Sequence, residues 1–399
     1  MIPGYRIAVL ISFLIFMLLL HCQKSPRLPE PTIVSETQRL PLLKDRPVRN
    51  IIFYIGDGMG ITQITSARIY AVGPDGRLTI DRFPITGLVT THSADRLVTD
   101  SAAGATAMST GVKTRNGIVG MSADSTAYTT ILEIAQELDK ATGLVATSSI
   151  THATPASFAA HVPSRRMESR IARQLLERKI NVLLGGGRAF FIPRNQDGSA
   201  RQDNQNLLDL ARNLGYTVVE TRQALQDADG PYLLGLFSDK GMLTQAPEPT
   251  LAEMTQKALK ILRNDPEGFF LMVEGSQIDW GGHANDAEKT IRQLLLFDEA
   301  VKVGVDFALH DLHTLVIVTA DHETGGMALE GGSLSHRKLD IDWTTDYHTG
   351  QSVPLFAFGP HALSFSGVLN NTDIPRLIAV LWGVSDFPRP LQRYSENLP

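Results

Sequence analysis

Ser101 is the residue of this chain best placed to act as a nucleophile. It directly follows Asp100 in VTDSAAGATAMSTG, residues 98–111, where a loop passes into a helix of small residues. The free N–H groups and the positive dipole end of such a helix attract anions, and a phosphate would suit the site. Asp and Ser are also ordinary helix caps. Taken alone, the segment favours a cap, so the chemistry depends on residues elsewhere.

Acidic and histidine residues follow three predicted strands, at the point where each strand ends. Asp57 follows IIFYIG, Glu274 follows FFLMV, and Asp321 and His322 follow TLVIVTA. Because the carboxyl ends of strands in an open α/β sheet line the ligand crevice, we expect these side chains to converge. Each acid alone is explained by helix capping. Converging carboxylates repel one another without cations, so the group predicts a cation site.

A second group of candidate ligands lies in IDWGGHAND. Asp279 and His283 are four residues apart on one side of a helical or turn segment, and both can reach one zinc ion. His348, in DYHTGQ before the strand VPLFAFG, provides another imidazole. Carboxylate and imidazole ligands without thiolate suit hydrolytic zinc better than structural zinc. Two such groups predict two adjacent metals, which can activate a nucleophile and hold the leaving oxygen of an in-line displacement.

The glycines of GDGMG, residues 56–60, do not predict a dinucleotide site. The third glycine comes one residue early for GxGxxG, and Asp57 would set a negative charge against a pyrophosphate. We expect these glycines to let the backbone turn tightly around a metal-bound carboxylate.

Apolar strands alternating with helices must position these side chains. From Asn50 onward the apolar runs are IIFYIG, GLVATSSI, INVLLGGG, FFLMVEG, TLVIVTAD and VPLFAFG. This pattern predicts an α/β fold with a central, mostly parallel sheet flanked by helices on both faces. Residues 197–245 are interpreted as helices and loops between core strands. Residues 326–347 are interpreted as a short surface insertion before the last core strand.

The chain of 399 residues is predicted to contain one catalytic domain, residues 49–385, with a tether before it, residues 23–48, and a tail after it, residues 386–399. Its net charge of −5 provides no basic face for nucleic acid. Residues 1–22 are typical of a signal peptide, because the apolar run is too short for a membrane span. We therefore expect an exported protein.

Cys22 is the only cysteine, so no intrachain disulfide can form. Its position resembles the lipidation point of bacterial lipoproteins, which would anchor the protein to a membrane. His21 departs from the small residue that is usual there, so a free or trimmed cysteine is the alternative. The prediction is a periplasmic protein or an outer-membrane-associated lipoprotein.

The chain resembles the alkaline phosphatase family in six segments, which occur in order: IGDGMG, VTDSAAGATAMSTG, THATPASFAAHVPSR, VEGSQIDWGGH, TADHETGG and HTGQSVPLFAFGPHA. The resemblance spans about residues 50–361. It implies the alkaline phosphatase fold and hydrolysis of small phosphate monoesters through a phosphoserine intermediate. It also implies two zinc ions, one magnesium ion and a homodimer.

The resemblance assigns residues to three metal sites and a phosphate site. It implies Asp279, His283 and His348 for the zinc at the leaving group; Asp57, Asp321 and His322 for the zinc that activates Ser101; and Asp57, Thr154 and Glu274 for magnesium. Arg165 would grip two phosphate oxygens with a fork that Lys could not reproduce, and Asp100 would orient it.

Two positions differ from the best-known bacterial pattern. His152 stands near the third metal where some members have Asp, and imidazole favours zinc or cobalt over hydrated magnesium. Trp280 lies beside the site where some members have Lys, which removes a cation that would contact phosphate through water. We expect weaker product retention and faster turnover.

Other functions are weighed against the monoesterase. A phosphodiesterase of the same superfamily needs room for a second ester group, which Arg165 and the third metal would crowd. A sulfatase needs a CxPxR-like context, and none surrounds Ser101. A non-catalytic phosphate- or metal-binding lipoprotein would be expected to lack Ser101, Arg165 or a zinc ligand, and all are present. The physiological ester is set by surface loops, which the sequence does not specify.

Overall fold

The computed structural model describes residues 38–334 and 337–391. The predicted signal peptide, Cys22 and most of the tether lie outside these ranges, as do residues 392–399 of the predicted tail. Residues 389–391, by contrast, hydrogen-bond to the segment 127–129. Within the described ranges, no helix combines the length and the apolar character that crossing a membrane requires.

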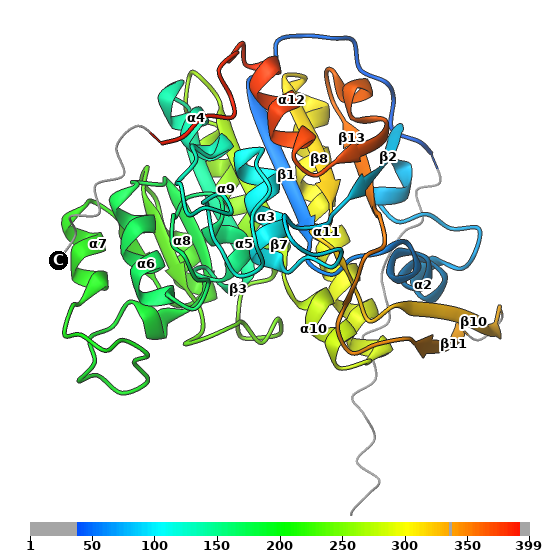
Figure 1. The fold of residues 1–399 in the computed structure, drawn as a ribbon, viewed down its shortest axis with the longest axis horizontal. Helices are drawn as coiled ribbons and strands as arrows, with labels where there is room; N and C mark the ends of the chain where they lie inside the picture. Colours follow the sequence, from blue (N-terminus) through cyan, green and yellow to red (C-terminus); the bar gives the residue numbers. More distant parts are fainter. Residues whose placement is uncertain (1–37, 335–336, 392–399) are drawn as a thin grey trace, which may run out of the picture. The chain divides into compact units, whose positions relative to one another are not determined.

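A ten-stranded sheet runs through the described residues (Figure 1). Its strands, in spatial order, are β14 (Gly367–Asn370), β2 (Ile85–Thr90), β13 (Val353–Phe358), β8 (Thr314–Thr319), β1 (Asn50–Gly56), β7 (Phe269–Gly275), β3 (Ala141–Ser149), β4 (Val182–Gly186), β6 (Leu233–Leu236) and β5 (Thr217–Val219). Only β13 runs antiparallel to its neighbours, β8 and β2. The predicted, mostly parallel α/β sheet is confirmed.

Eleven α-helices connect the described strands. They are α2 (Ile61–Val72), α3 (Ser101–Thr110), α4 (Ile131–Glu137), α5 (Ala153–Ala156), α6 (Glu168–Glu177), α7 (Leu207–Asn213), α8 (Arg222–Asp227), α9 (Leu251–Leu262), α10 (Gln277–His283), α11 (Ala287–Asp311) and α12 (Asp373–Leu381). The 25-residue α11 begins at the Asp286 cap, whose side chain accepts from Lys289 N–H. Such caps satisfy backbone donors that have no partner in the helix.

Aromatic residues of the central strands contact elements on both faces of the sheet. Neighbouring residues of a strand point to opposite faces. In β1, Tyr54 donates a hydrogen bond to the Ala300 carbonyl of α11, whereas Phe53 packs edge-on against Phe158, just after α5. Phe270 of β7 stacks on the same Phe158. The central strands are therefore buried on both sides, which explains their continuous apolar sequences.

Residues 197–245 differ from the prediction, and the predicted insertion at residues 326–347 has a defined structure. Residues 197–245 are not only helices and loops, because β5 and β6 in this interval extend the sheet at one edge. Both strands are short, three and four residues, so their periodicity was too weak to distinguish from a loop. The predicted insertion is a two-stranded hairpin of β10 (Met327–Ser333) and β11 (Lys338–Trp343), with α2 alongside it (Figure 1).

Candidate active site

The candidate site lies at the carboxyl ends of four adjacent strands, β8, β1, β7 and β3. Asp57 follows β1, Glu274 is the penultimate residue of β7, and Asp321 and His322 follow β8. The turn after β3 leads into the short helix α5, which carries Thr154. All five side chains are fully buried. The parallel arrangement of these strands brings together residues that lie up to 265 positions apart in the chain.

Ser101 is the first residue of α3 and is 2% exposed. Asp100 caps the helix, because its side chain accepts a hydrogen bond from Ala103 N–H at 3.0 Å. The Ser101 hydroxyl lies 3.4 Å from Nε2 of His322. The cap and the candidate nucleophile are thus consecutive residues of one helix start, and the two interpretations of this segment are compatible.

Small residues allow α3 and the turn after β1 to approach the site closely. A Cβ on Gly104 would lie 3.1 Å from the Asp321 carbonyl oxygen and 3.3 Å from its Cβ. Gly58 has φ +74°, and a Cβ there would lie 2.7 Å from Cα of Asp279. The glycines of GDGMG therefore let the backbone pass beside the carboxylates, as the sequence suggested.

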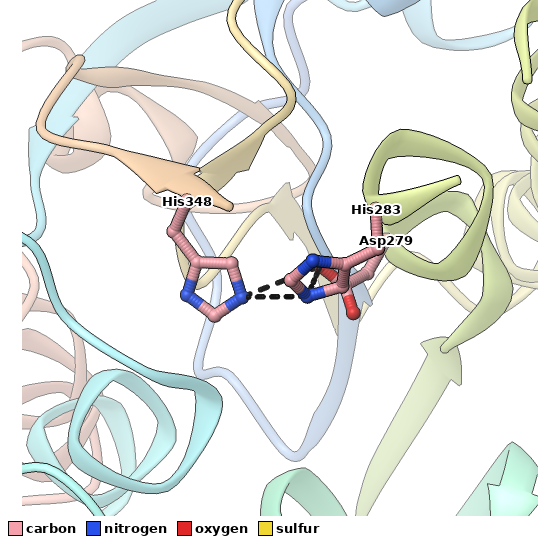
Figure 2. A group of neighbouring side chains, drawn as sticks. All are labelled: Asp279, His283 and His348. Atoms are coloured by element: carbon pink, nitrogen blue, oxygen red, sulfur yellow. Dashed lines mark hydrogen bonds and ion pairs between the residues drawn. The ribbon is translucent and has the colours of Figure 1, made fainter. Parts of the chain in front are cut away.

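Asp279, His283 and His348 form the first candidate metal group (Figure 2). Nε2 of His283 lies 3.1 Å from Nε2 of His348 and 3.4 Å from Oδ1 of Asp279. Oδ1 of Asp279 lies 3.5 Å from Nε2 of His348. The two histidines reach this point from β12 (His348–Thr349) and from α10, on opposite sides.

Backbone carbonyls hold both imidazoles in one tautomer. Nδ1 of His283 lies 2.7 Å from the Asp346 carbonyl, and Nδ1 of His348 lies 2.8 Å from the Thr99 carbonyl. A carbonyl only accepts, so each Nδ1 carries the proton and each Nε2 presents a lone pair to the centre of the group. Metal-binding histidines are oriented in this way.

His322 is the centre of the second group. Its Nε2 lies 3.2 Å from Oδ2 of Asp321, 3.5 Å from Oδ1 of Asp57 and 3.4 Å from the Ser101 hydroxyl. Asp279 adjoins this group as well, because ligand atoms of Asp57, Asp279 and His322 all lie within 4.8 Å of one another. The first and second groups are therefore neighbours.

The third group contains Asp57, Glu274 and His152, whose ligand atoms also lie within 4.8 Å of one another. Two serines orient Glu274, since Ser276 and Ser148 donate to its Oε2 at 2.7 and 3.2 Å. Oε1 of Glu274 and both carboxylate oxygens of Asp57 accept no hydrogen bond from the described residues. Burying a carboxylate oxygen without a donor costs desolvation free energy, which a bound cation would offset.

In the metal-free protein, clustering and burial shift the pKa values of the acids and of His322. Burial, with Asp321 and Asp279 nearby, raises the pKa of Asp57 well above its usual range. Burial raises the pKa of Glu274 to about 7 and, together with Asp279, that of Asp321 to about 6. Burial and the neighbouring His348 lower the pKa of His322. A bound cation would offset the repulsion that raises the pKa values of these carboxyls, and the neutral His322 ring could act as a ligand.

The donor sets also fit metal ions in geometry. A tetrahedral ion with bonds of about 2.0 to 2.1 Å places its ligand atoms about 3.3 Å apart. The first group has separations of 3.1, 3.4 and 3.5 Å. The separations around His322 are 3.2, 3.4 and 3.5 Å. Oxygen and imidazole ligands at these spacings are compatible with a transition-metal ion.

Arg165 lies beside the three groups, with its guanidinium held at two points. One Nη donates to Oδ2 of Asp100 at 3.1 Å, and the other lies 3.0 Å from Nε2 of His152. Since guanidinium only donates, His152 accepts through Nε2. Burial and the Arg165 charge lower the pKa of His152 to about 3, so the ring is neutral. His152 thus contacts Arg165 as well as adjoining the third group.

Trp280 lies on α10, between Asp279 and His283 in the chain, and its ring contacts the segment after β6. A Cβ on Gly241 would lie 2.2 Å from the ring, so Gly241 supports it from the segment after β6. Nζ of Lys289 lies 5.8 Å from the ring centroid. The Lys289 ammonium therefore lies within cation–π range of the Trp280 ring.

Sequence reasoning missed several residues that orient the site. The Thr324 hydroxyl donates to Oδ1 of Asp279 at 2.5 Å and lies 3.2 Å from Nδ1 of His322, so it links two groups. Thr99 and Asp346 act through backbone carbonyls, for which a sequence has no signal. The sequence did contain a signal for Thr324, because TADHETGG places this hydroxyl residue two positions after His322.

The fold and the site define a class of protein in which neighbouring candidate cation sites adjoin a serine at the start of a helix, at the carboxyl ends of parallel strands. Comparison with known proteins identifies the family. The model of the alkaline phosphatase family matches residues 48–339 and 334–384. This chain therefore belongs to the alkaline phosphatase family.

Individual relatives agree over most of the chain. Alkaline phosphatase 3 of Bacillus subtilis (strain 168) is 35% identical, over 82% of this chain and 88% of its own. Alkaline phosphatase of Escherichia coli (strain K12) is 34% identical, over 83% and 85%. The alkaline phosphatase from the Antarctic bacterium TAB5 superposes with a TM-score of 0.78 at 36% identity, over 86% of this chain and all of that one. A His-to-Asp variant of it has been solved with magnesium in its M3 site.

Proposed function

We propose that this protein hydrolyses small phosphate monoesters with Ser101 as the nucleophile. The observation that carries the proposal is the set of separations, 3.2 to 3.5 Å, that place the Ser101 hydroxyl and two carboxylates around Nε2 of His322. A hydroxyl in this position would be activated by a cation that Asp57, Asp321 and His322 would hold.

Three metal sites follow from the three groups. We propose zinc at Asp279, His283 and His348, zinc at Asp57, Asp321 and His322, and a third ion at Asp57, Thr154 and Glu274. When bound, the zinc ions would lower the pKa of the Ser101 hydroxyl and neutralise charge on the departing oxygen. The third ion is magnesium, or zinc or cobalt where Nε2 of His152 binds the ion in place of its hydrogen bond from Arg165. Magnesium in the M3 site of the TAB5 variant supports a third site of this kind.

The chain's own residues perform the displacement. Oγ of Ser101 attacks phosphorus in line with the ester oxygen, so the Oγ–P bond forms as the P–O ester bond breaks and the alcohol leaves. Water then cleaves the phosphoserine, releasing inorganic phosphate and restoring the hydroxyl. Each step inverts phosphorus, so the result is net retention. The Ser101 hydroxyl must lose its proton, which favours alkaline pH.

Phosphate binding depends on Arg165 and on the start of α3. Arg165 presents two parallel N–H donors to two non-bridging oxygens, while Asp100 fixes the direction of the guanidinium. The free N–H groups of α3 add positive potential at Ser101. Arg165 and the third site occupy the space that a second ester substituent would need, which favours monoesters over diesters.

Ser101→Ala tests the nucleophile. We expect loss of acid-stable phosphoenzyme and of p-nitrophenyl phosphatase activity, with zinc content close to wild type because the six other zinc ligands remain. Phosphoenzyme formation in the alanine variant would contradict the assignment.

Substrate analogues and a chelator test the reaction class. The wild-type protein should cleave p-nitrophenyl phosphate much faster than its bis-ester or sulfate analogue. Chelation should abolish the activity, and added zinc should restore it. Equal rates on monoester and diester would favour the phosphodiesterase alternative, and phosphate binding without turnover would favour a binding protein.

Localisation and assembly are part of the proposal. We propose export to the periplasm, with an outer-membrane anchor where Cys22 is lipidated, and a homodimer as the family resemblance implies. The names of the bacterial relatives support the family but not these details. Cys22→Ser should move a lipidated protein from the membrane fraction to the soluble fraction, and light scattering should give twice the mass of one chain.

A further inference from the structure

Glu323 is a buried carboxylate whose hydrogen-bond donors, among the described residues, are not candidate metal ligands. It is 2% exposed and lies between His322 and Thr324 in β9 (Glu323–Thr324). Four donors surround it. Gln63 Nε2 and Met327 N–H donate to Oε1 at 2.7 and 3.2 Å, and Gly326 N–H and the Thr349 hydroxyl donate to Oε2, the former at 3.2 Å.

The four donors belong to three separate parts of the chain. Gln63 is on α2, Gly326 and Met327 begin the β10–β11 hairpin, and Thr349 is on β12. β9 and β12 pair antiparallel, with Thr349 opposite Glu323 and His348 opposite Thr324. The Glu323 side chain therefore fastens the strand that carries His348 to the strand that follows His322.

This pairing sets the distance between ligands of the two zinc groups. The rings of His322 and His348 stack with centroids 3.5 Å apart and planes 18° apart. Neither ring reaches this position from a long helix or from a strand of the main sheet, because His322 lies between β8 and β9 and β12 has only two residues. Such short segments need additional bonds to hold a fixed position.

Only a carboxylate can accept from all four donors. Each of its two oxygens takes two hydrogen bonds, whereas a glutamine would present an amide NH₂ to donors on one side. The fit is also specific in space, since a Cβ on Gly60 would lie 2.5 Å from Cγ of Glu323. Gln63 additionally donates to the Thr324 carbonyl at 3.0 Å, so the same contacts hold the segment that bonds Asp279.

We propose that Glu323 is a positioning residue for both zinc groups, which acts by fixing β9 against β12 and so setting the spacing of His322 and His348. The inference rests on the proposed zinc sites. It assigns Glu323 no contact with metal or substrate. The third group lies on β7 and after β1 and β3, outside this bonding, so its ion should be unaffected.

Zinc affinity of the isosteric variant E323Q tests the proposal. Metal-free protein is titrated with Zn²⁺ against a chromogenic chelator, and Co²⁺ is added separately to record its visible absorption. We expect E323Q to bind Zn²⁺ about tenfold more weakly, the lower end of what outer contacts of metal sites contribute. The Co²⁺ spectrum should change, while magnesium retention stays at the wild-type level.

E330Q is the matched control, because Glu330 is an exposed carboxylate on the hairpin strand β10. It should bind Zn²⁺ as the wild type does. Thr349→Val removes one donor at moderate cost and should show a smaller loss, so it serves as the test if E323Q fails to fold.

Two results would overturn the inference. One is equal Zn²⁺ affinity in folded E323Q and wild type, even where the melting temperature of the metal-free variant falls, because that pattern indicates a role in folding alone. The other is equal loss of zinc and magnesium. A wild-type protein that binds Zn²⁺ but cleaves no phosphate monoester would contradict the proposed function, while the Zn²⁺ affinities of E323Q and wild type could still be compared. A wild-type protein that binds no Zn²⁺ would overturn both the proposed function and the role of Glu323.

Discussion

Single residues in this site serve two partners at once. Asp100 caps α3 and pairs with Arg165, and Thr324 links Asp279 to His322. His152 adjoins the third group and contacts Arg165. A substitution at such a position has effects on both partners, so tests must separate them.

Arg165→Lys should lower kcat/KM for p-nitrophenyl phosphate and weaken inhibition by inorganic phosphate. Lys keeps the charge but loses the planar fork that contacts two oxygens, a change worth about 1 to 3 kcal/mol, or roughly 5- to 150-fold. Steady-state kinetics measure both effects. Arg166→Lys, at the exposed neighbouring residue, is the control and should leave them unchanged. A wild-type phosphate inhibition constant in the Arg165 variant would contradict its role.

Trp280→Lys should tighten phosphate binding and slow turnover, since it restores a cation beside the site. The structure adds a cost, because the variant loses ring packing against Gly241 and brings a second charge near Lys289. We expect a lower inhibition constant for phosphate together with a lower melting temperature. The idea fails if the inhibition constant does not change.

At the scale of elements, the start of α3 contains Asp100, which is both the helix cap and the partner of Arg165, and Ser101, the proposed nucleophile. Asp100 accepts from Ala103 N–H through Oδ1, from Gly117 N–H through both oxygens, and from Arg165 through Oδ2. The helix start thereby holds the loop at Gly117 and the Arg165 guanidinium together. Asp100 is therefore both a structural cap and a positioning residue.

Replacing Asp100 by Asn and by Ala should separate these roles. Asn keeps the oxygen that caps the helix but turns an amide NH₂ toward the Arg165 and Gly117 donors, so kcat/KM should fall roughly tenfold while stability falls less than in the Ala variant. Ala loses both oxygens and should also cost about 1 kcal/mol of unfolding free energy. Urea unfolding and kinetics on the same samples measure the two effects. Equal stability of the two variants would show that the cap contributes little.

At the scale of the whole molecule, the sheet brings several buried acids together at the carboxyl ends of its strands. Without bound cations, the burial and mutual repulsion of these acids lower the free energy of unfolding. Burial raises the pKa of Glu274 from 4.5 to about 7. In the metal-free protein the folded state therefore binds this proton more tightly than the unfolded chain. Between these two pKa values, stability must decrease as pH rises.

Glu274→Gln isolates this effect. Without metal, wild type should lose about 1 to 3 kcal/mol of unfolding free energy relative to the Gln variant as pH rises from about 4.5 to 7. The shift arises first from burial, which Gln tolerates because it carries no charge. Denaturant unfolding at several pH values, in the presence of chelator, measures the difference. A constant difference across the range would contradict the raised pKa, and excess Mg²⁺ should favour the wild type.

The sequence by itself determined the strands that matter most and the residues at their ends. Continuous apolar runs identified β1, β3, β4, β7, β8 and β13. These strands are buried on both faces, so apolar residues occupy successive positions instead of alternating with polar ones. The convergence of Asp57, Glu274 and Asp321 followed from the parallel arrangement, since carboxyl ends of such strands share one edge. The short strands β5 and β6 escaped detection because three or four residues carry too little periodicity.

The tertiary structure alone decided how the side chains are oriented and which neighbours they share. The tautomers of His283 and His348 depend on carbonyls of Asp346 and Thr99, and backbone acceptors have no signature in residue type. The contact of His152 with Arg165 and the four donors around Glu323 likewise join distant segments. Local sequence specifies which groups are available, whereas their spacing to within an ångström depends on how the whole chain packs.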